Sequence, residues 1–219
     1  MQNSVQNLIT IKKKIEDRLN DLGKSKSPKI IAVSKTFPIE KIHPLIDCGH
    51  LDFGENKVQE SVDKWSNIKS KNKNINLHFI GKLQRNKVKY VVKIFDYIHS
   101  VDNEKLAKKI SEEMKSANRN IKIFIQVNIG QESQKSGVDL KNLDKLFSFC
   151  KQINLNVIGF MCLPPEKDDP KKYFIEMESL AKKYDLKDLS MGMSSDYLHA
   201  IEYSSTFIRI GSDIFGNEE

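Results

Sequence analysis

Short apolar runs alternate with amphipathic stretches along most of this chain, and these two patterns predict strands and helices respectively. The apolar runs that we expect to form strands are 30–35, 51–55, 77–82, 97–101, 121–129, 155–163, 188–193 and 207–211. Helical spacing of apolar residues is found between them, at 38–47, 56–68, 85–95, 103–118, 139–153, 170–184 and 196–202. Another amphipathic helix is predicted over 2–22, with Gly23 as its C-cap, and a short tail from Ser212 to Glu219 follows the last strand.

Strands that alternate with helices favour a parallel sheet with right-handed crossovers. Eight such strands in 219 residues predict a closed (β/α)8 barrel over 30–216, preceded by an N-terminal helix within 1–24 that covers one mouth or the closing seam. An open doubly wound sheet is the alternative, because periodicity alone does not show closure. No composition break, long Pro/Gly linker or internal repeat divides the sequence, so we expect residues 1–219 to form a single domain.

The composition favours a globular protein of the cytoplasm. Hydrophobic residues make up 39% of the chain and charged residues 30%, and no apolar stretch has the length of a membrane-spanning helix. The first residues lack the basic and then apolar pattern of a signal peptide. Cys48, Cys150 and Cys162 are widely spaced, which predicts reduced thiols and neither a disulfide framework nor a zinc site.

The formal net charge of +7 raises nucleic acid as a partner. The lysines, however, are scattered along predicted helices beside acidic residues, as in 12–18, and no basic stripe alternates with aromatic residues. We therefore expect solvated helix faces and no specific nucleic-acid binding, with at most weak, salt-sensitive attraction to polyanions.

One lysine, Lys35, stands at the predicted carboxyl end of the first strand. A helical pattern follows it from Thr36, with Pro38 in the first turn. In parallel barrels and sheets this end of the strands binds ligands and carries the chemistry. A lysine amine surrounded there by apolar side chains can attack a carbonyl to form an imine. The alternative is a structural lysine that extends its amine to water.

The segments after the last two predicted strands could bind a phosphate. In barrels of this kind a phosphate is frequently bound by these loops and a nearby helix N-terminus. Residues 192–196 and 209–213 offer glycine, serine hydroxyls and accessible backbone N–H groups. Arg209 shares its face of the strand with Gly211, so it is expected to point into the barrel, toward a ligand or toward an inward carboxylate in a structural ion pair.

Other candidate groups are less specific. His78 alternates with apolar residues, which is more typical of a core histidine than of a ligand-binding one, and no base is placed to activate Ser194 or Cys162. No metal-ligand spacing is present. A lysine and a phosphate site on one rim predict a ligand that carries both a carbonyl and a phosphate. Pyridoxal 5′-phosphate (PLP) fits, in a cofactor-binding protein or a PLP enzyme, and so does a sugar phosphate, in a Schiff-base aldolase.

The strand-end segments resemble those of a known family, the YggS/PROSC-type pyridoxal phosphate homeostasis proteins. Each motif alone is weak, but together and in order they are specific, and they extend over most of the chain. They are Ala32-Val33-Ser34-Lys35, Phe53-Gly54-Glu55-Asn56 with Val58-Gln59-Glu60, His78-Phe79-Ile80-Gly81 with Leu83-Gln84 and Asn86-Lys87, Ser100-Val101-Asp102, Gln126-Val127-Asn128 with Lys135 and Gly137, Gly159 with Met161, Ser190-Met191-Gly192-Met193-Ser194 with Asp196, Arg209-Ile210-Gly211 and Ile214-Phe215-Gly216.

The resemblance implies a barrel like the N-terminal domain of alanine racemase, the fold type III of PLP enzymes, with PLP as the cofactor. Matched position by position, it implies that Lys35 forms the Schiff base and that Arg209 faces the pyridine nitrogen. A cation there disfavours protonation of that nitrogen and makes the cofactor a poorer electron sink. The residues with which the family binds the phosphate match Ser194, Gly211 and Ser212. The residue that lines the family's pocket next to the cofactor matches Asn56.

The chain departs from the family pattern at two positions. The family usually has glycine at the position of Ser204, and if that glycine has a positive φ, serine there costs on the order of 1 kcal/mol in strain. Lys57 stands where an aromatic residue is common. Neither position belongs to the predicted lysine and phosphate sites, so PLP binding is still expected.

The resemblance favours a monomeric PLP carrier or regulator in PLP homeostasis over an enzyme, since the family has no firmly established catalysis. A racemase needs a base on each face of the bound substrate, and alanine racemase takes its second base from another domain, for which this sequence has no residues after the predicted barrel. Other B6 vitamers and apo-PLP enzymes are the expected partners besides PLP. The alternative is a PLP-dependent amino acid racemase or lyase with the second base supplied by a partner.

Overall fold

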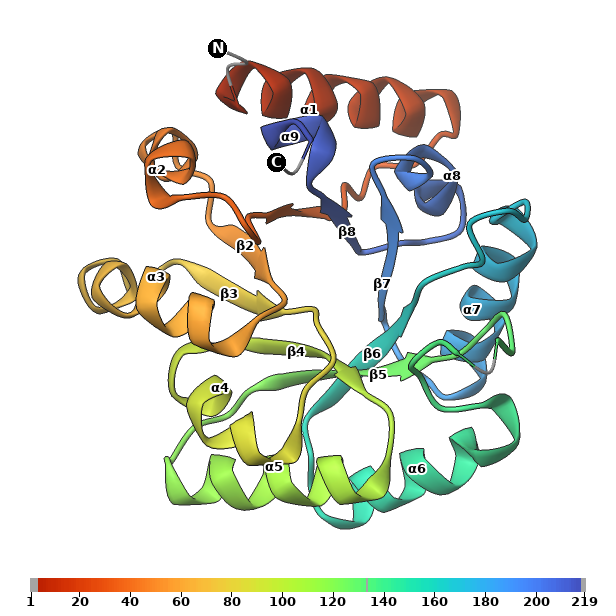
Figure 1. The fold of residues 1–219 in the computed structure, drawn as a ribbon. Helices are drawn as coiled ribbons and strands as arrows, with labels where there is room; N and C mark the ends of the chain where they lie inside the picture. Colours follow the sequence, from red (N-terminus) through yellow and green to blue (C-terminus); the bar gives the residue numbers. More distant parts are fainter. Residues whose placement is uncertain (1–3, 133, 218–219) are drawn as a thin grey trace.

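The computed structural model describes residues 4–132 and 134–217, and within them eight parallel strands close into a barrel (Figure 1). Each strand pairs with the next along the chain, and β8 pairs with β1, so the predicted barrel is confirmed and the open sheet is wrong. The strands are β1 Lys29–Val33, β2 Asp52–Glu55, β3 Asn76–Phe79, β4 Tyr97–Val101, β5 Lys122–Val127, β6 Val157–Cys162, β7 Asp188–Met193 and β8 Phe207–Ile210.

Helices surround the barrel on the outside (Figure 1). They are α1 Ser4–Asp21, α2 Ile39–Asp47, α3 Val58–Lys71, the 3-10 helix η1 Arg85–Lys87, α4 Val88–Ile94, α5 Glu104–Ser116, α6 Leu140–Gln152, α7 Lys171–Lys183, α8 Tyr197–Glu202 and α9 Ser212–Phe215.

Three local predictions need correction. The stretch 85–95 is not one helix, because its first turn is the 3-10 helix η1. The tail after the last strand contains the short helix α9, whose N-cap position is Gly211, while the final residues 218–219 lie outside the described residues. The first strand ends at Val33 and the helix after it begins at Ile39, so Lys35 does not end the strand but lies with Thr36 in a turn between β1 and α2, which the Phe37 N–H closes by donating to the Ser34 backbone oxygen.

The main hydrophobic core lies between the strands and the surrounding helices. Helix α5 shows how a local sequence pattern produces this packing. The side chain of Asn103 caps its N-terminus by accepting a hydrogen bond from the Leu106 N–H at 2.9 Å. Helical spacing then places Leu106, Ile110 and Met114 on one buried face. Helices that pack on the outside in this way cover the outward-facing apolar side chains of the strands.

A second, smaller cluster fills the inside of the barrel. Its buried members are Ile31, Tyr97, Phe124, Met161 and Phe207. Two fully buried histidines lie among these rings. The His78 ring stacks on Tyr97 with centroids 4.2 Å apart, and the His99 ring stacks on Phe124 at 4.3 Å. The barrel is thus packed with side chains below the ligand-binding rim, as in other (β/α)8 barrels.

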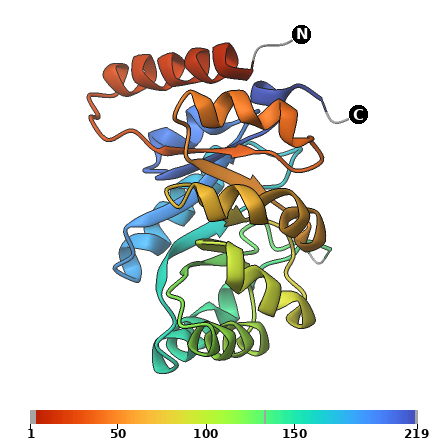
Figure 2. The same ribbon diagram turned by 90° about the vertical axis from the view of Figure 1, so that its left-hand side faces the viewer.

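Helix α1 covers the seam where the barrel closes. It packs against α2, α8 and α9, and in Figure 2 it extends along the top of the molecule above β1. Leu8, Ile11, Ile15 and Leu19 form its buried face. The Asn7 side-chain amide donates a hydrogen bond to the backbone oxygen of Ile214 at 2.9 Å, which joins α1 directly to α9. Of the two positions expected for this helix, the seam is the one it takes.

No helix within residues 4–132 and 134–217 has the length and apolar character that a membrane span requires.

The buried histidines predict a specific loss of stability in acid. Burial lowers the pKa of both His78 and His99 from the usual 6.5, and His99 is lowered further by His78 and Arg209. Below about pH 6.5 the unfolded chain therefore binds protons that the folded chain does not, so the free energy of unfolding falls as the pH falls. We expect His99→Leu to reduce this slope by about 1 kcal/mol per pH unit, measured by urea unfolding between about pH 6 and pH 5.

The matched control is His43→Leu, because His43 is exposed on α2. The slope of this variant should equal that of the wild type. An equal slope in all three proteins would contradict the prediction, whatever the absolute stability of the His99 variant.

Candidate functional site

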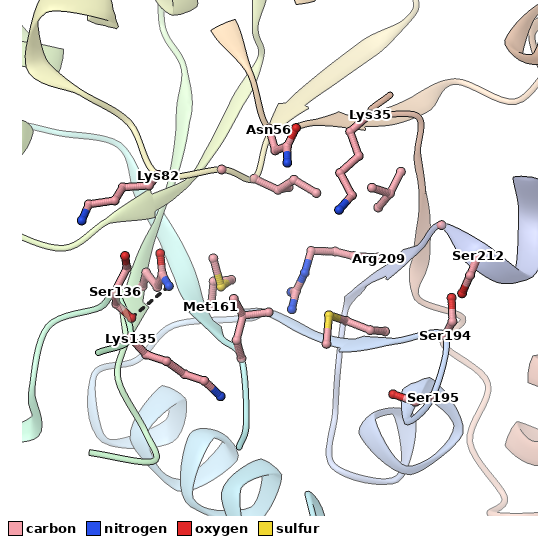
Figure 3. A pocket seen from close by; sticks show the side chains of 17 residues that line it. Lys35, Asn56, Lys82, Lys135, Ser136, Met161, Ser194, Ser195, Arg209 and Ser212 are labelled. Carbon is pink, nitrogen blue, oxygen red and sulfur yellow. Dashed lines mark hydrogen bonds between the residues drawn. The ribbon is translucent and has the colours of Figure 1, made fainter. Parts of the chain in front are cut away.

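A cavity of about 640 Å³ opens at the carboxyl ends of the strands (Figure 3). Its lining includes all of the site residues predicted from the sequence: Lys35, Asn56, Ser194, Arg209, Gly211 and Ser212. Figure 3 shows Lys35, in the turn that follows β1, and Arg209, on the neighbouring strand β8, entering it. The structure therefore brings together residues that lie up to 177 positions apart, from Lys35 to Ser212.

The backbone next to Lys35 is strained. Thr36 has a φ of +65°, in the left-handed region that a β-branched residue rarely adopts. Its N–H donates a hydrogen bond of 2.8 Å to the Oε1 atom of Glu60 on α3. Strain of this kind persists only where the surroundings hold the backbone, and it is concentrated at functional sites. Here it redirects the chain immediately after the half-buried Lys35.

A buried polar cluster fixes the residue before Lys35. The Oε1 atom of Glu55 accepts hydrogen bonds from the Ser34 hydroxyl at 2.8 Å, the Trp65 indole at 2.8 Å and the Lys64 ammonium at 3.1 Å. Lys64 also donates to the backbone oxygen of Ser34 at 2.9 Å. Burial raises the pKa of Glu55, and the Lys64 ammonium opposes that rise. Lys35 therefore extends from a backbone that is held on both sides.

Arg209 is buried at the base of the cavity, and its hydrogen-bond partners are neutral. Its Nη1 atom donates to the hydroxyl of Ser190 at 2.7 Å, and its Nη2 atom donates to the backbone oxygen of Cys162 at 2.9 Å. Among the described residues it forms no ion pair with a carboxylate, so the structural ion pair considered above is absent there. Burial lowers the pKa of the guanidinium, yet an arginine remains charged at neutral pH. A buried cation of this kind can bind an acceptor on a ligand.

Serine hydroxyls gather at one end of the cavity. Ser194 follows β7, and Ser212 follows Gly211 at the end of β8 (Figure 3). The two loops are in contact, since the Asp213 N–H donates to the Ser194 hydroxyl at 3.4 Å. Two strand ends therefore supply hydroxyl and backbone donors at one place, which suits an anionic group.

Asn56 contributes a polar atom without a partner in the protein. Its Oδ1 atom is buried and has no hydrogen bond in the structure, which is uncommon for a buried oxygen. The backbone of Gly81 passes so close to Asn56 that a Cβ atom at Gly81 would lie 2.2 Å from the Asn56 backbone oxygen. The glycine at position 81 is therefore required by this close approach, and Figure 3 shows the amide nitrogen of Asn56 directed toward the cavity.

The other end of the cavity contains residues that the sequence did not single out as site residues, including Gln126, Lys135 and Ser136 (Figure 3). The Lys135 ammonium lies 2.7 Å from the Oε2 atom of Glu132 and 3.2 Å from the backbone oxygen of Pro164. Gln126 could have been found from its place at the carboxyl end of the fifth predicted strand. Lys135 and Ser136 belong to the loop before α6, whose path the hydrophobic pattern does not encode.

Among residues 4–132 and 134–217 there is no metal site, and the buried Cys162 thiol beside Arg209 is not activated. No group of histidine, cysteine and carboxylate side chains there could bind a metal ion. Burial raises the pKa of the Cys162 thiol to about 12, so it is not a nucleophile at neutral pH.

The two departures from the family pattern lie outside the cavity. Ser204 has a φ of +62°, so the strain expected for serine in place of glycine is present, and its hydroxyl donates a hydrogen bond to Glu178. Lys57 is exposed at the N-cap position of α3. The lining of the site does not include either residue.

Comparison with known proteins agrees with this geometry. The family model described as alanine racemase, N-terminal domain, matches residues 9–219. The pyridoxal phosphate homeostasis protein of Aquifex aeolicus is 35% identical over 228 aligned positions, which cover 99% of each chain. The solved structure of PipY from Synechococcus elongatus without PLP is 31% identical, with a TM-score of 0.82 over 92% of this chain and all of PipY. PipY has also been solved with PLP bound.

A more distant likeness shows the fold alone. Alanine racemase from Clostridium difficile is 13% identical, with a TM-score of 0.74 over 99% of this chain and 57% of the racemase. The family match and the full-length relatives place the chain more closely. It belongs to the family of pyridoxal phosphate homeostasis proteins, whose barrel is that of the alanine racemase N-terminal domain.

Proposed function

We propose that this protein binds PLP as a Schiff base on Lys35 and acts as a carrier or regulator in PLP homeostasis. The observation that carries the proposal is the buried Arg209 guanidinium without a carboxylate partner among the described residues, in the same cavity as Lys35. A buried cation and an amine on neighbouring strands suit a ligand with a ring heteroatom and an aldehyde. The PLP-bound structure of PipY and the names of the relatives support the same ligand.

Each residue of the site has a separate role in this proposal. The Nζ atom of Lys35 bonds to the aldehyde carbon with loss of water, and PLP supplies that aldehyde together with an electron-withdrawing ring. Arg209 donates to the ring nitrogen and disfavours its protonation. Ser194, Gly211 and Ser212 bind the phosphate, and Asn56 lines the pocket with an amide nitrogen that can donate a hydrogen bond.

The principal alternative is an amino acid racemase or lyase, which requires a second proton-transfer group opposite Lys35. The described part of the lining contains no tyrosine or cysteine. Lys135 lies toward the other end of the cavity, but its ammonium is bound to Glu132 and to the backbone oxygen of Pro164. A sugar-phosphate aldolase would also use the lysine and the phosphate loops. It gives no role to the buried guanidinium beside a ring nitrogen.

Other B6 vitamers and apo-PLP enzymes are the partners that we propose beyond PLP. A monomeric state and a cytoplasmic location complete the proposal as predictions, which sedimentation of the PLP-loaded protein and cell fractionation can test.

Replacing Lys35 tests the covalent bond. With added PLP, the wild-type protein should develop a yellow absorption band that borohydride fixes as an adduct on Lys35. Lys35→Ala should lose the band and the adduct, because no other amine takes its place. Lys82→Ala removes another lysine of the same lining and should keep both. Absorption spectra and peptide mass spectrometry provide the measurement, and a wild type without an adduct would contradict the proposal.

The phosphate site predicts selectivity between PLP and pyridoxal. Ser194→Ala should weaken PLP binding by about tenfold, because a hydrogen bond to a charged group contributes about 1.5–3 kcal/mol. Binding of pyridoxal, which lacks the phosphate, should change little, and fluorescence titration can measure both affinities. Ser136→Ala, at the other end of the cavity, is the control and should leave the ratio of the two affinities unchanged. Equal losses for PLP and pyridoxal in Ser194→Ala would place the phosphate elsewhere.

Carrier and enzyme differ in their action on amino acids. We expect the PLP-loaded protein to transfer PLP to an apo-enzyme while leaving the α-protons of amino acids unexchanged in deuterated water over hours. NMR of a panel of amino acids and recovery of the apo-enzyme's activity measure the two properties. Exchange at a catalytic rate, lost in Lys35→Ala, would favour the racemase or lyase.

A further inference from the structure

A chain of hydrogen bonds connects Arg209 with the opposite mouth of the barrel. Ser190 Oγ lies 2.7 Å from Arg209 Nη1 and 2.8 Å from His99 Nδ1. The Nε2 atom of His99 lies 3.0 Å from Nδ1 of His78, and Nε2 of His78 lies 3.0 Å from Oδ1 of Asp52. Asp52 begins β2, at the amino end of the strands, and is partly exposed there. Of these residues, only Arg209 was expected from the sequence to have a functional role.

The two ends of this chain determine the direction of every hydrogen bond in it. A guanidinium has no acceptor, so Arg209 donates to Ser190. An ionised carboxylate has no donor, so His78 donates to Asp52 through Nε2. A neutral His78 then accepts at Nδ1 from Nε2 of His99. A neutral His99 accepts at Nδ1 from the Ser190 hydroxyl, whose oxygen accepts from Arg209. Every proton therefore points from the cavity toward Asp52.

The charges of these groups agree with this order. Burial lowers the pKa of both imidazoles, which favours their neutral forms at pH 7. Burial opposes ionisation of Asp52, yet the pKa of its carboxyl is lowered, because His78 donates a hydrogen bond to it and Lys29 carries a positive charge nearby. Lys29, at the start of β1, and His50, whose Nε2 atom is 2.9 Å from the Asp52 backbone oxygen, are the neighbouring basic groups.

We propose that Asp52, His78, His99 and Ser190 are positioning residues that orient the Arg209 guanidinium toward the ligand through one chain of hydrogen bonds, which ends on the carboxylate of Asp52. The inference rests on the proposed function insofar as Arg209 meets the ring nitrogen of PLP. Ser190 holds one nitrogen of the guanidinium and the backbone oxygen of Cys162 holds the other, so the group has one orientation. The hydrogen bonds polarise one another, which strengthens each of them in the low dielectric of the barrel interior.

The direction of the chain can be tested on the ligand-free protein. Long-range 1H–15N spectra of histidine-labelled protein at pH 7 report the tautomer of each imidazole. We expect both His78 and His99 to be neutral and protonated at Nε2. A proton at Nδ1 of His99, or a charged imidazole at either position, would overturn the proposal without any reference to PLP.

Ser190→Ala tests the positioning of Arg209. In the ligand-free wild type the two Nη resonances of Arg209 should be separate, because each nitrogen has a different acceptor. In Ser190→Ala they should merge, and PLP affinity should fall by about tenfold. Ser190→Thr, which keeps the hydroxyl, should restore both properties. Separate resonances and full affinity in Ser190→Ala would overturn the proposal.

Asp52→Asn tests the polarisation of the chain, because it keeps an acceptor for His78 and removes the negative charge at the far end, while Asp196, the carboxylate whose charge acts on Arg209 from the cavity side, stays in place. The pH at which the visible band of the PLP-loaded protein changes should move to lower pH, since a cation near the ligand is then less compensated. The matched control is Asp188→Asn, which removes a half-buried carboxylate at the same mouth, at the start of β7 and outside the chain. Asp52→Asn should move the transition at least about twice as far as the control. Equal shifts would show general electrostatics and overturn this part of the proposal.

The results of these experiments distinguish a failure of the proposed function from a failure of the hydrogen-bond chain. Absence of PLP binding with the expected tautomers and separate Arg209 resonances would contradict the proposed function and leave the orientation of Arg209 by the chain established. PLP binding with the wrong tautomers would contradict the chain alone.

Discussion

A positive charge buried inside a barrel determines what must surround it. Removing the Arg209 guanidinium from water costs several kcal/mol unless its N–H groups find acceptors. The acceptors here are a hydroxyl and a backbone oxygen, and the hydroxyl in turn needs an acceptor for its own proton. His99 is that acceptor. His99 in turn needs an acceptor for its own N–H group, which is His78, and the N–H group of His78 finds its acceptor in Asp52 at the opposite mouth. One line of hydrogen-bonded polar side chains therefore crosses the interior of the barrel, and aromatic rings stack on its two histidines. The cost of burying the charge explains why a barrel core that could be wholly aliphatic is not.

The lysine is positioned by a different device. Where Arg209 is supported by a line of hydrogen bonds inside the barrel, Lys35 is supported from outside, by the end of β2 and by α3. Glu55 on β2 holds Ser34, Glu60 on α3 holds Thr36, and Lys64 on α3 bridges the two carboxylates. This support keeps a threonine in the left-handed region, so the turn after β1 is held in place although it belongs to no helix or strand. The amine of Lys35 extends from this turn into the cavity.

The order of elements could be predicted from the sequence, because strand and helix periodicities are local. The strand ends pointed to Lys35, Arg209 and the two loops that follow β7 and β8, and the family resemblance added Asn56; the structure places all six named residues in the lining of one cavity. The sequence did not predict what holds those residues. His99 lies within a register shift between β4 and β5, and Ser190 borders another between β7 and β8. The alternation of side chains along one strand does not reveal a shift in its pairing with the next strand. The direction in which His99 and Ser190 point could therefore not be predicted from that alternation. His78 was correctly assigned to the core, but its partner Asp52 stands at a strand start, where a carboxylate usually meets water. The short helix α9 was missed because four residues carry no periodicity.

The contact between α1 and α9 has a consequence for the newly made protein. The residues proposed to bind the phosphate lie at the start of α9 and at the end of β8, and α9 is held in place by α1 through packing and through Asn7. Helix α1 thus waits for α9, which is made much later, and β1 stays without its partner β8 until then. A nascent chain on the ribosome can assemble most of the helices and strands of the barrel, but the cavity remains open on one side until residues 207–215 have emerged. Cofactor binding consequently requires these residues, and it can report that the barrel has closed.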